Sequence, residues 1–488
     1  MKKIYNTLVV FAVILFAASC TKSFDAINTD PDNPKEEDVT STNVLAFCER
    51  YASDNLFDEW FDLNESCGFS GQIAKWMYTE EGYYAFRPNV NSSSWNVCYR
   101  TISNLQGIIE KEEEGSNMWA VATIFQCQIY QITSDRWGNI PYSEACKLYL
   151  DGGITQPKYD KQSDIYPDLL SRLSAAVNAL DEDGDDIGNG DVMLNGDIEL
   201  WKKYGNALRL RIAARIANVA SAQAEAVFEE IAAEDIPVDN DDNIFFTAWG
   251  NEYAEPWADY YLTRKNEYGI SKLMVETLDG LEDPRLPVYA MPTTAYTKGE
   301  STVPYVGYQN GQKAQANTAK HSKIGNRFQS KSGLTGFSPW LRSCEVYFAI
   351  AYGASKGYNV GMTQQEAYEK AVTLSLEECG VSAADIEAYM AGAGAYDGTA
   401  EQLFTQWWIS VFKNGQEAWS VYRMSGYPAG NVIAPSSSYP NHNVPPMAYP
   451  YPDTEANLNN ANYKVEAAAE VDFFWGKKMW WDVRTGIN

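Results

Sequence analysis

The pattern of apolar and polar residues along the chain predicts helices much more often than strands. The clearest period lies in residues 198–220, where six apolar residues recur on one helical face while Arg209 and Arg215 lie off it. The stripe consists of Trp201, Tyr204, Leu208, Ile212, Ile216 and Val219. Similar spacing predicts helices over residues 40–57, 116–133, 339–355, 362–380 and 399–415. Because strand-like alternation is scarce, we expect a mainly α protein in which successive helices form pairs.

Several predicted helices also carry sequence signals for their ends. Pro339 is placed to begin the helix at 339–355, since proline is tolerated in the first helical turn. Thr363 followed by Glu366 forms a capping box, and Gly380 and Gly415 are placed to end two helices. No clean fixed-period repeat accompanies these helices.

Long segments without helical periodicity separate the helices, and they are rich in aromatic residues. The chain contains 15 Trp, 32 Tyr and 19 Phe, which make up 14% of its residues. Two aromatic clusters lie in such segments: "KWMYTEEGYYAFRPN" at 75–89 and "FFTAWGNEYAEPWADYY" at 245–261. A flat ring with a polar edge can stack on sugar faces or peptide planes. These clusters are therefore the candidate ligand-binding surface.

Within the two clusters, turn-forming residues such as Gly82, Gly250 and Pro256 allow the backbone to aim side chains outward. We predict that eight rings bind the ligand: Trp76, Tyr78, Tyr83, Tyr84, Trp249, Trp257, Tyr260 and Tyr261. The alternative is that these rings fill the core, with Trp249 and Trp257 packed between helices. Because the clusters are far apart in sequence, a shared cleft requires the fold to bring them together.

The N-terminus reads as a lipoprotein signal. Lys2 and Lys3 precede an apolar stretch of eleven residues, 8–18, which is too short to cross a bilayer. Small residues then lead directly to Cys20, although Ala17 stands where such a lipobox prefers leucine. We predict cleavage before Cys20, a diacylglyceryl thioether on its thiol and acylation of its amine, which would hold the protein on a membrane. A plain secretion signal followed by a chance cysteine is the alternative.

Charge and motif searches exclude several classes of function. A formal net charge of −27 disfavours nucleic acid and anionic lipid as partners. His321 and His442 are the only histidines, and the acidic run at 181–192 departs from a calcium loop. Ser355 matches a nucleophile-elbow pattern but falls at a predicted helix end. We therefore predict no catalytic residue, no metal and no cofactor, although 65 carboxylates leave an unrecognised glycosidase pair open.

Eight segments, in one order from Cys20 to the C-terminus, resemble the SusD/RagB family of outer-membrane nutrient-binding lipoproteins. They are "SFDAINTDPDNP" (23–34), "SDRWGNIPYSEA" (134–145), "GDIELWKKYGNALRLRIAARIA" (196–217), "LEDPRLPVY" (281–289), "CEVYFAIAYGASKG" (344–357) with "EAYEKAVTLSLEECGV" (366–381), "KNGQEAWSVYRMSGYP" (413–428), "MAYPYPDTEANLNNANYK" (447–464) and "KMWWD" (478–482). The chain is most similar to the SusD-like subgroup with the W-G-x-I-P-Y and G-x-E-A-W motifs.

The resemblance implies a division of the chain into a signal peptide at 1–19, a lipidated tether at 20–40 and a helical ligand-binding domain at 41–488. It implies tetratricopeptide-like helix pairs that carry long irregular loops on the ligand face. It also implies a non-enzymatic protein at the cell surface, lipid-anchored to the outer membrane, that delivers oligosaccharides or peptides to a SusC-like TonB-dependent transporter. A lipid-anchored glycan hydrolase and a structural helical-repeat adaptor are the alternatives.

Overall fold

The computed structural model describes residues 39–148, 153–231, 235–249, 253–330, 336–439, 441–467 and 472–488. The predicted signal peptide, Cys20 and nearly all of the tether lie outside these described residues. Within them, every helix is too short or too polar to span a bilayer. The seven cysteines among the described residues are free thiols, and five of them are buried.

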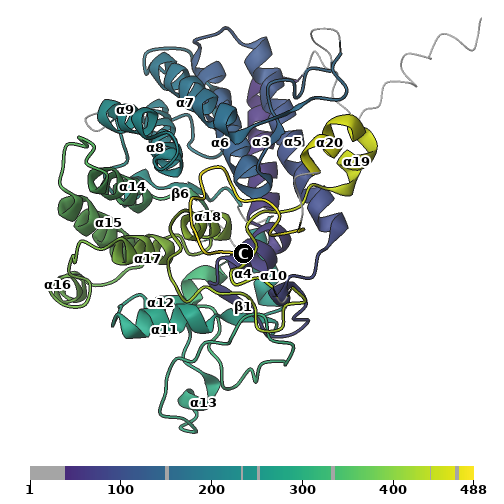
Figure 1. The fold of residues 1–488 in the computed structure, drawn as a ribbon. Coiled ribbons are helices and arrows are strands. Elements are labelled where there is room, and N and C mark those ends of the chain that lie inside the picture. Colours follow the sequence, from purple (N-terminus) through teal and green to yellow (C-terminus); the bar gives the residue numbers. More distant parts are fainter. Residues whose placement is uncertain are drawn as a thin grey trace, which may run out of the picture.

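The N-terminal half of the scaffold is a row of helices in which each packs on the next (Figure 1). They are α3 (Ser41–Leu56), α5 (Pro88–Lys111), α6 (Asn117–Trp137), α7 (Gln162–Ala179), α8 (Ile198–Ile216) and α9 (Ser221–Ile231). Apart from Trp119, every residue of α6 is buried. A helix enclosed on all sides by other elements forms the centre of a core, and α6 has this role here.

The row continues through the C-terminal half, because α14 packs against α8. Its helices are α14 (Ser343–Ser355), α15 (Gln364–Glu378), α16 (Ala383–Ala391), α17 (Ala400–Ser410) and α18 (Gly415–Ser425). Figure 1 shows these helices as an arc around one side of the molecule, with α18 near its centre. The predicted mainly α fold with paired helices is confirmed. The capping box at Thr363 is also confirmed, since Thr363 and Glu366 bond each other's backbone N–H.

Two predicted helix boundaries are wrong. Gly415, predicted to end a helix, is the first residue of α18, since α17 ends at Ser410. Pro339 does not begin a helix. Residues Ser338–Leu341 form strand β6, which pairs antiparallel with β4 (Ile244–Phe246), and α14 begins only at Ser343. The register shifts between Ile244, which faces Leu341, and Phe245, which faces Pro339. Proline fits such an irregular two-stranded pair because it has no N–H to leave unbonded.

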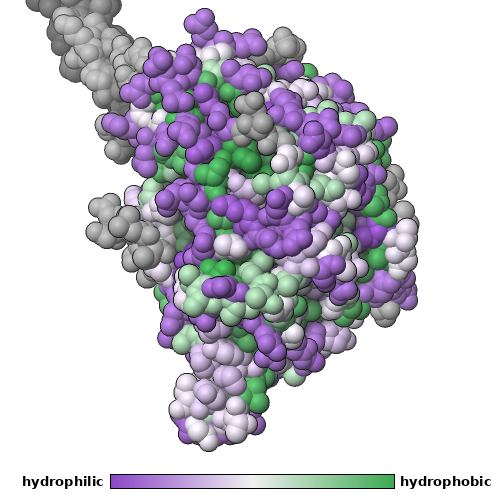
Figure 2. All heavy atoms as spheres, turned by 90° about the vertical axis from the view of Figure 1, so that its left-hand side faces the viewer, coloured by the Kyte–Doolittle hydropathy of each residue, from purple (hydrophilic) through white to green (hydrophobic). Residues whose placement is uncertain are grey.

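Short elements make up the irregular lobe and the connections. The lobe contains the π-helix η2 (Glu59–Ser66), α4 (Cys67–Phe69), β1 (Ile73–Lys75), η3 (Glu81–Tyr83), α10 (Pro256–Thr263), β5 (Tyr268–Ile270), α11 (Lys272–Gly280), α12 (Leu286–Tyr289), α13 (Thr294–Thr297) and η6 (Asn326–Gln329). The remaining elements are β2 (Ile140–Pro141), β3 (Tyr159–Asp160), η4 (Gly188–Gly190), η5 (Asn240–Asp242), α19 (Asp453–Leu458) and α20 (Asn460–Ala467). The lobe with α13 protrudes at the bottom of the molecule, and Figure 2 shows its surface in the pale colours of near-neutral hydropathy.

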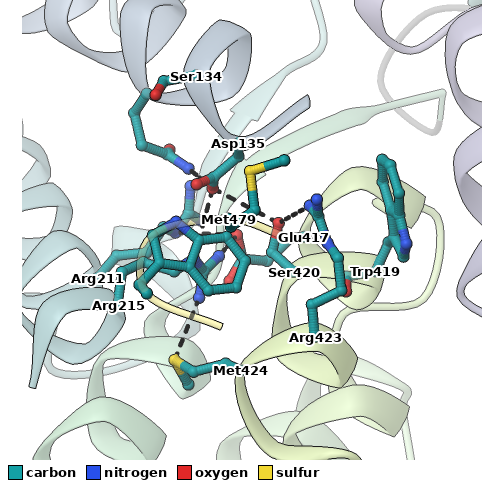
Figure 3. A network of polar contacts seen from close by, with 12 residues as sticks. Ser134, Asp135, Arg211, Arg215, Glu417, Trp419, Ser420, Arg423, Met424 and Met479 are labelled. Atoms are coloured by element: carbon teal, nitrogen blue, oxygen red, sulfur yellow. Dashed lines mark hydrogen bonds and ion pairs between the residues drawn. The ribbon is translucent and has the colours of Figure 1, made fainter. Parts of the chain in front are cut away.

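A buried ionic network joins α6, α8 and α18 (Figure 3), and Arg211 extends it to Glu345 of α14. Arg215 bonds Glu417 and lies 3.4 Å from Asp135, while Arg211 lies 2.9 Å from Glu345. Burial alone would raise the pKa of Glu417, but Arg215 and Arg211 outweigh it and lower the pKa. Charges removed from water persist only when they are paired in this way.

The two arginines beside the apolar stripe of α8 do not face water. Arg209 and Arg215 lie off the apolar stripe, yet both are buried, at 4% and 0% exposed. The Arg209 guanidinium is paired with the carboxylate of Glu230, 2.7 Å away, which is exposed at the surface. The segments 196–217 and 413–428, which carry the family resemblance, thus meet in the core as structural partners. Ser355 is the last residue of α14, as expected for a helix end.

Candidate functional site

The eight predicted rings divide into buried and accessible groups. Five are at most 4% exposed: Trp76, Tyr84, Trp249, Trp257 and Tyr261. Tyr78 is 62% exposed, and Tyr83 and Tyr260 are half-buried. A fully buried ring offers no face to a ligand in this conformation, and the burial of Trp249 and Trp257 matches the alternative that they pack in the core. The binding role of the accessible rings stays a prediction.

The fold does bring the two aromatic clusters together, through the β1–β5 pair. Ala74 faces Gly269 in this pair, and the Trp76 N–H donates to the carbonyl of Glu267 over 2.6 Å. Trp76 itself packs against Gly269, where a Cβ would lie 1.9 Å from the indole ring. Only glycine permits this approach. The first cluster therefore lies beside the segment that follows α10, the helix on which Tyr260 is found.

A further accessible ring, Trp60, was missed by the sequence analysis. It lies on η2 and is half-buried, as are Trp119 and Trp480, whereas the other tryptophans are buried. The Lys75 ammonium is 5.9 Å from the Trp60 ring centroid. The sequence does contain a signal for the start of this helix: Asp58 caps η2 by accepting from the Trp60 and Phe61 N–H groups.

Lys75 and its partners form a polar centre between these rings. Its ammonium donates to Asn64 over 2.8 Å and to Glu81 over 2.6 Å, and it lies 5.4 Å from the Tyr268 ring centroid. The ring centroids of Tyr260 and Tyr268 are 6.0 Å apart. Burial alone would raise the pKa of Glu81, but its bond and ion pair with Lys75 lower it, so Glu81 stays charged.

Tyr78 and Tyr83 follow β1 in a stretch that contacts residues 313–316 through Trp76, Thr79 and Tyr83. Tyr78 has a φ of +50°, a left-handed conformation that is uncommon for a residue with a side chain. The backbone here is held by the Ala316 N–H, which donates to the Trp76 carbonyl over 3.1 Å. The Lys313 ammonium is 5.7 Å from the Tyr83 ring centroid.

We call the accessible rings Trp60, Tyr78, Tyr83 and Tyr260 the aromatic surface. Trp60, Tyr83 and Tyr260 lie on connected elements, because η2 contacts both α10 and η3. Tyr78 lies in the bend between β1 and η3, which contact each other. Burial raises the pKa of Tyr260. The pKa of Tyr83 is also raised, mainly by burial and to a smaller extent by the charges of Glu80 and Glu81. Both phenols are therefore neutral near pH 7 and able to donate a hydrogen bond while their rings stack.

A separate open cavity of about 610 Å³ lies between α11, the start of α17 and residues 428–430. Its wall combines carboxylates of Glu276, Asp397 and Glu401 with hydroxyl, amide and small apolar groups, and contains no aromatic ring. The cavity lacks the flat apolar face on which a sugar ring stacks, so it is a weaker candidate for the ligand site than the aromatic surface.

The described residues contain no group of three or more His, Cys, Asp or Glu side chains arranged to hold a metal ion. In the acidic run 181–192, the carboxylates bond the protein itself. Asp185 accepts from the Asn117 N–H over 2.8 Å, and Asp186 accepts from the Gly188 N–H over 2.7 Å. Asp191 accepts from Leu194, Gly196 and the Trp201 indole.

Paired helices that carry an irregular lobe with accessible rings define a helical scaffold protein of the SusD-like class. The chain belongs to the SusD-like family whose model is described as starch-binding associating with outer membrane, and which matches residues 37–452. None of the curated protein sequences compared with the chain matches it.

Solved structures share this fold over nearly the whole chain. A chitin-binding protein is 27% identical with a TM-score of 0.80, covering 91% of this chain and 100% of its own. A chitin-binding SusD homolog from Flavobacterium johnsoniae is 22% identical with a TM-score of 0.77, covering 91% and 99%. A SusD-like protein from Bacteroides thetaiotaomicron is 23% identical with a TM-score of 0.77 and the same coverage.

Proposed function

We propose that the protein is a lipid-anchored, non-enzymatic binding protein of the outer membrane that captures an oligosaccharide on the aromatic surface. In this proposal it delivers the ligand to a SusC-like TonB-dependent transporter. The observation that carries the binding role is the accessibility of four rings, above all Tyr78 at 62% exposed, on a surface built around one buried lysine. Ring stacking on pyranose faces is the interaction such a surface provides.

The aromatic surface has the rigidity that stacking needs. Trp60 lies on a helix with a double cap from Asp58, and Lys75 is fixed by two side-chain acceptors. The backbone before Tyr78 is paired on both sides, with Glu267 and with Ala316. Rings that are already ordered lose little conformational entropy when the ligand binds, which favours affinity.

The comparisons support a glycan rather than a peptide as the ligand. The family model is described as starch-binding, and two of the similar structures are chitin-binding proteins. We therefore place oligosaccharides first, and keep peptides as the second ligand class, because aromatic rings stack on peptide planes as well.

A panel experiment tests the proposal. The purified protein is titrated with starch, chitin, galactan and pectin oligosaccharides and with mixed peptides, and binding is followed by calorimetry and by the rise in melting temperature. We expect saturable binding of at least one glycan and no change in its chain length after long incubation. Turnover of the glycan would favour the hydrolase alternative, and the absence of any ligand would favour the structural adaptor.

A further inference from the structure

Charge is distributed unevenly along this acidic chain. Asp and Glu account for 65 of its 488 residues, yet residues 301–344 contain neither. The same stretch contains six basic residues: Lys313, Lys320, Lys323, Arg327, Lys331 and Arg342. This segment therefore carries net positive charge in a protein of net charge −27.

Only two of the described basic residues in this stretch have an anionic partner. Arg327 and Arg342 both pair with Glu378, each over 2.9 Å. Within the described part of the chain, Lys313, Lys320 and Lys323 form no ion pair with a carboxylate, and neither does Lys265 on the neighbouring segment. Lys331 lies outside the described residues.

Lys265 and Lys323 lie close enough to repel each other. The Lys323 ammonium donates to the side-chain oxygen of Asn266 over 3.2 Å, which holds it beside Lys265. Partial burial, and then the charge of Lys265, lower the pKa of Lys323. Two cations held together without a counter-ion raise the energy of the empty protein, and an anion placed between them would lower it.

The Lys265–Lys323 pair lies near one ring of the aromatic surface, because Lys265 follows Arg264, whose guanidinium carbon is 5.1 Å from the Tyr260 ring centroid. Lys265 precedes β5 by three residues, and Lys323 follows Ser322, whose carbonyl accepts from the Ile270 N–H of β5 over 3.2 Å. The ring centroids of His321 and Trp76 are 6.3 Å apart. The Lys313 ammonium lies 5.7 Å from the ring centroid of Tyr83, another ring of the aromatic surface.

The neighbouring acids determine where an anionic group fits. Glu81 is neutralised by Lys75 and Arg87, and Glu267 lies 3.2 Å from Arg264. Glu80 is exposed near Tyr83 and would repel an anion there. The Lys265–Lys323 side is therefore the more favourable position for a negative charge.

We propose that the ligand is an anionic glycan, a uronate- or sulfate-bearing oligosaccharide whose acidic groups lie on Lys265 and Lys323 while its sugar rings stack on the aromatic surface. This inference rests on the proposed function and narrows its ligand class. The negative charge of the rest of the protein does not prevent it, because charges beyond about 8 Å are largely screened at physiological ionic strength.

Matched glycan pairs that differ only in charge test the ligand class. Polygalacturonate is compared with its methyl ester, and sulfated carrageenan with the desulfated galactan, using calorimetry at 0.05 M and 0.5 M NaCl. We expect at least one anionic member to bind about tenfold or more tightly than its neutral partner, and to lose affinity at high salt. The glycan pair whose anionic member binds more tightly identifies the carboxylate or the sulfate as the recognised group.

Variants test the position of the site. The double variant Lys265→Gln with Lys323→Gln is expected to weaken binding of the anionic glycan about tenfold and to reduce its salt dependence. Lys464→Gln removes an exposed charge on α20, far from the lobe in Figure 1, and is expected to change neither. Melting temperatures should be unchanged in all variants, since none of these lysines pairs with a described carboxylate.

Three results would overturn the inference. Equal or tighter binding of the neutral partners would contradict the ligand class and leave the proposed glycan-binding function intact. Unchanged binding of the anionic glycan by the double variant would contradict the position. Binding of no polysaccharide, charged or neutral, would contradict the proposed function itself together with this inference.

Discussion

Asp62 shows how burial of a single carboxyl group couples stability to pH. The residue lies in η2, is 1% exposed, and accepts from the Gly415 N–H over 2.7 Å. Burial raises its pKa from 3.8 to about 6, against the opposing effects of its hydrogen bonds and of Lys413. Its contribution to stability is therefore fully present below about pH 4 and is lost as the pH rises to about 6.

The variant Asp62→Asn tests this coupling, since an amide oxygen can still accept from Gly415. We expect the free energy of unfolding to vary less between pH 4 and 6 than in the parent protein, by on the order of 2–3 kcal/mol. Urea denaturation at each pH measures this free energy, and Asp183→Asn, a substitution at an exposed position, is the control. An unchanged pH profile in Asp62→Asn would show that the carboxyl group titrates normally in the folded protein.

At the level of single residues, the sequence could name aromatic candidates but could not sort them. Trp249 and Trp257 lie in a segment without helical periodicity, as Tyr78 does, yet they are buried. For Trp257, part of the cover comes from a distant segment, since the Lys413 ammonium lies 5.4 Å from its ring centroid. Such contacts join residues about 150 positions apart and leave no local pattern. Trp60 was missed because a π-helix does not follow the 3.6-residue period.

At the level of elements, Arg215 joins three helices through one guanidinium. It is 0% exposed and pairs with Asp135 of α6 and Glu417 of α18. We expect Arg215→Leu to lower the free energy of unfolding by about 3–5 kcal/mol, because Asp135 loses its paired guanidinium and Glu417 keeps only Arg211, 3.8 Å away. The exposed pair of Lys272 and Glu276, 3.6 Å apart, provides the control, and Lys272→Leu should cost less than about 1 kcal/mol. Equal losses in the two variants would argue against a structural role for the network.

Helices were predicted well because the signals that specify them are local. Apolar periodicity and the capping box at Thr363 depend on residues within a few turns. The error at Pro339 has the opposite cause, since β6 forms only by pairing with β4, almost 100 residues earlier. The β1–β5 pair that unites the aromatic clusters was likewise beyond local patterns, although Gly269 marks the position where Trp76 packs.

At the level of the whole molecule, the N-terminus and the partner can be tested together. If Cys20 carries the lipid, wild-type protein should be in the outer-membrane fraction and Cys20→Ser should not yield a membrane-bound mature form. Mass spectrometry of the wild-type N-terminal peptide measures the modification directly. An unmodified Cys20 amine and thiol would contradict the lipid anchor.

The proposed transporter partner should remain with the protein during mild detergent extraction. Stable interfaces usually bury more than about 1,200 Å², so we expect a large outer-membrane protein to copurify with the wild type in comparable amount. Recovery of the protein alone from native membranes, in several mild detergents, would argue against delivery to a transporter.

The most direct test of the central claim is the affinity of the double variant Trp60→Ala with Tyr78→Ala for the best glycan of the panel. Loss of stacking rings should weaken binding at least tenfold, while the melting temperature changes little, because Tyr78 is exposed and Trp60 half-buried. Phe47→Ala, which removes a 37% exposed ring on α3, should leave affinity unchanged. Parent-like affinity in the double variant would contradict the assignment of the aromatic surface as the ligand site.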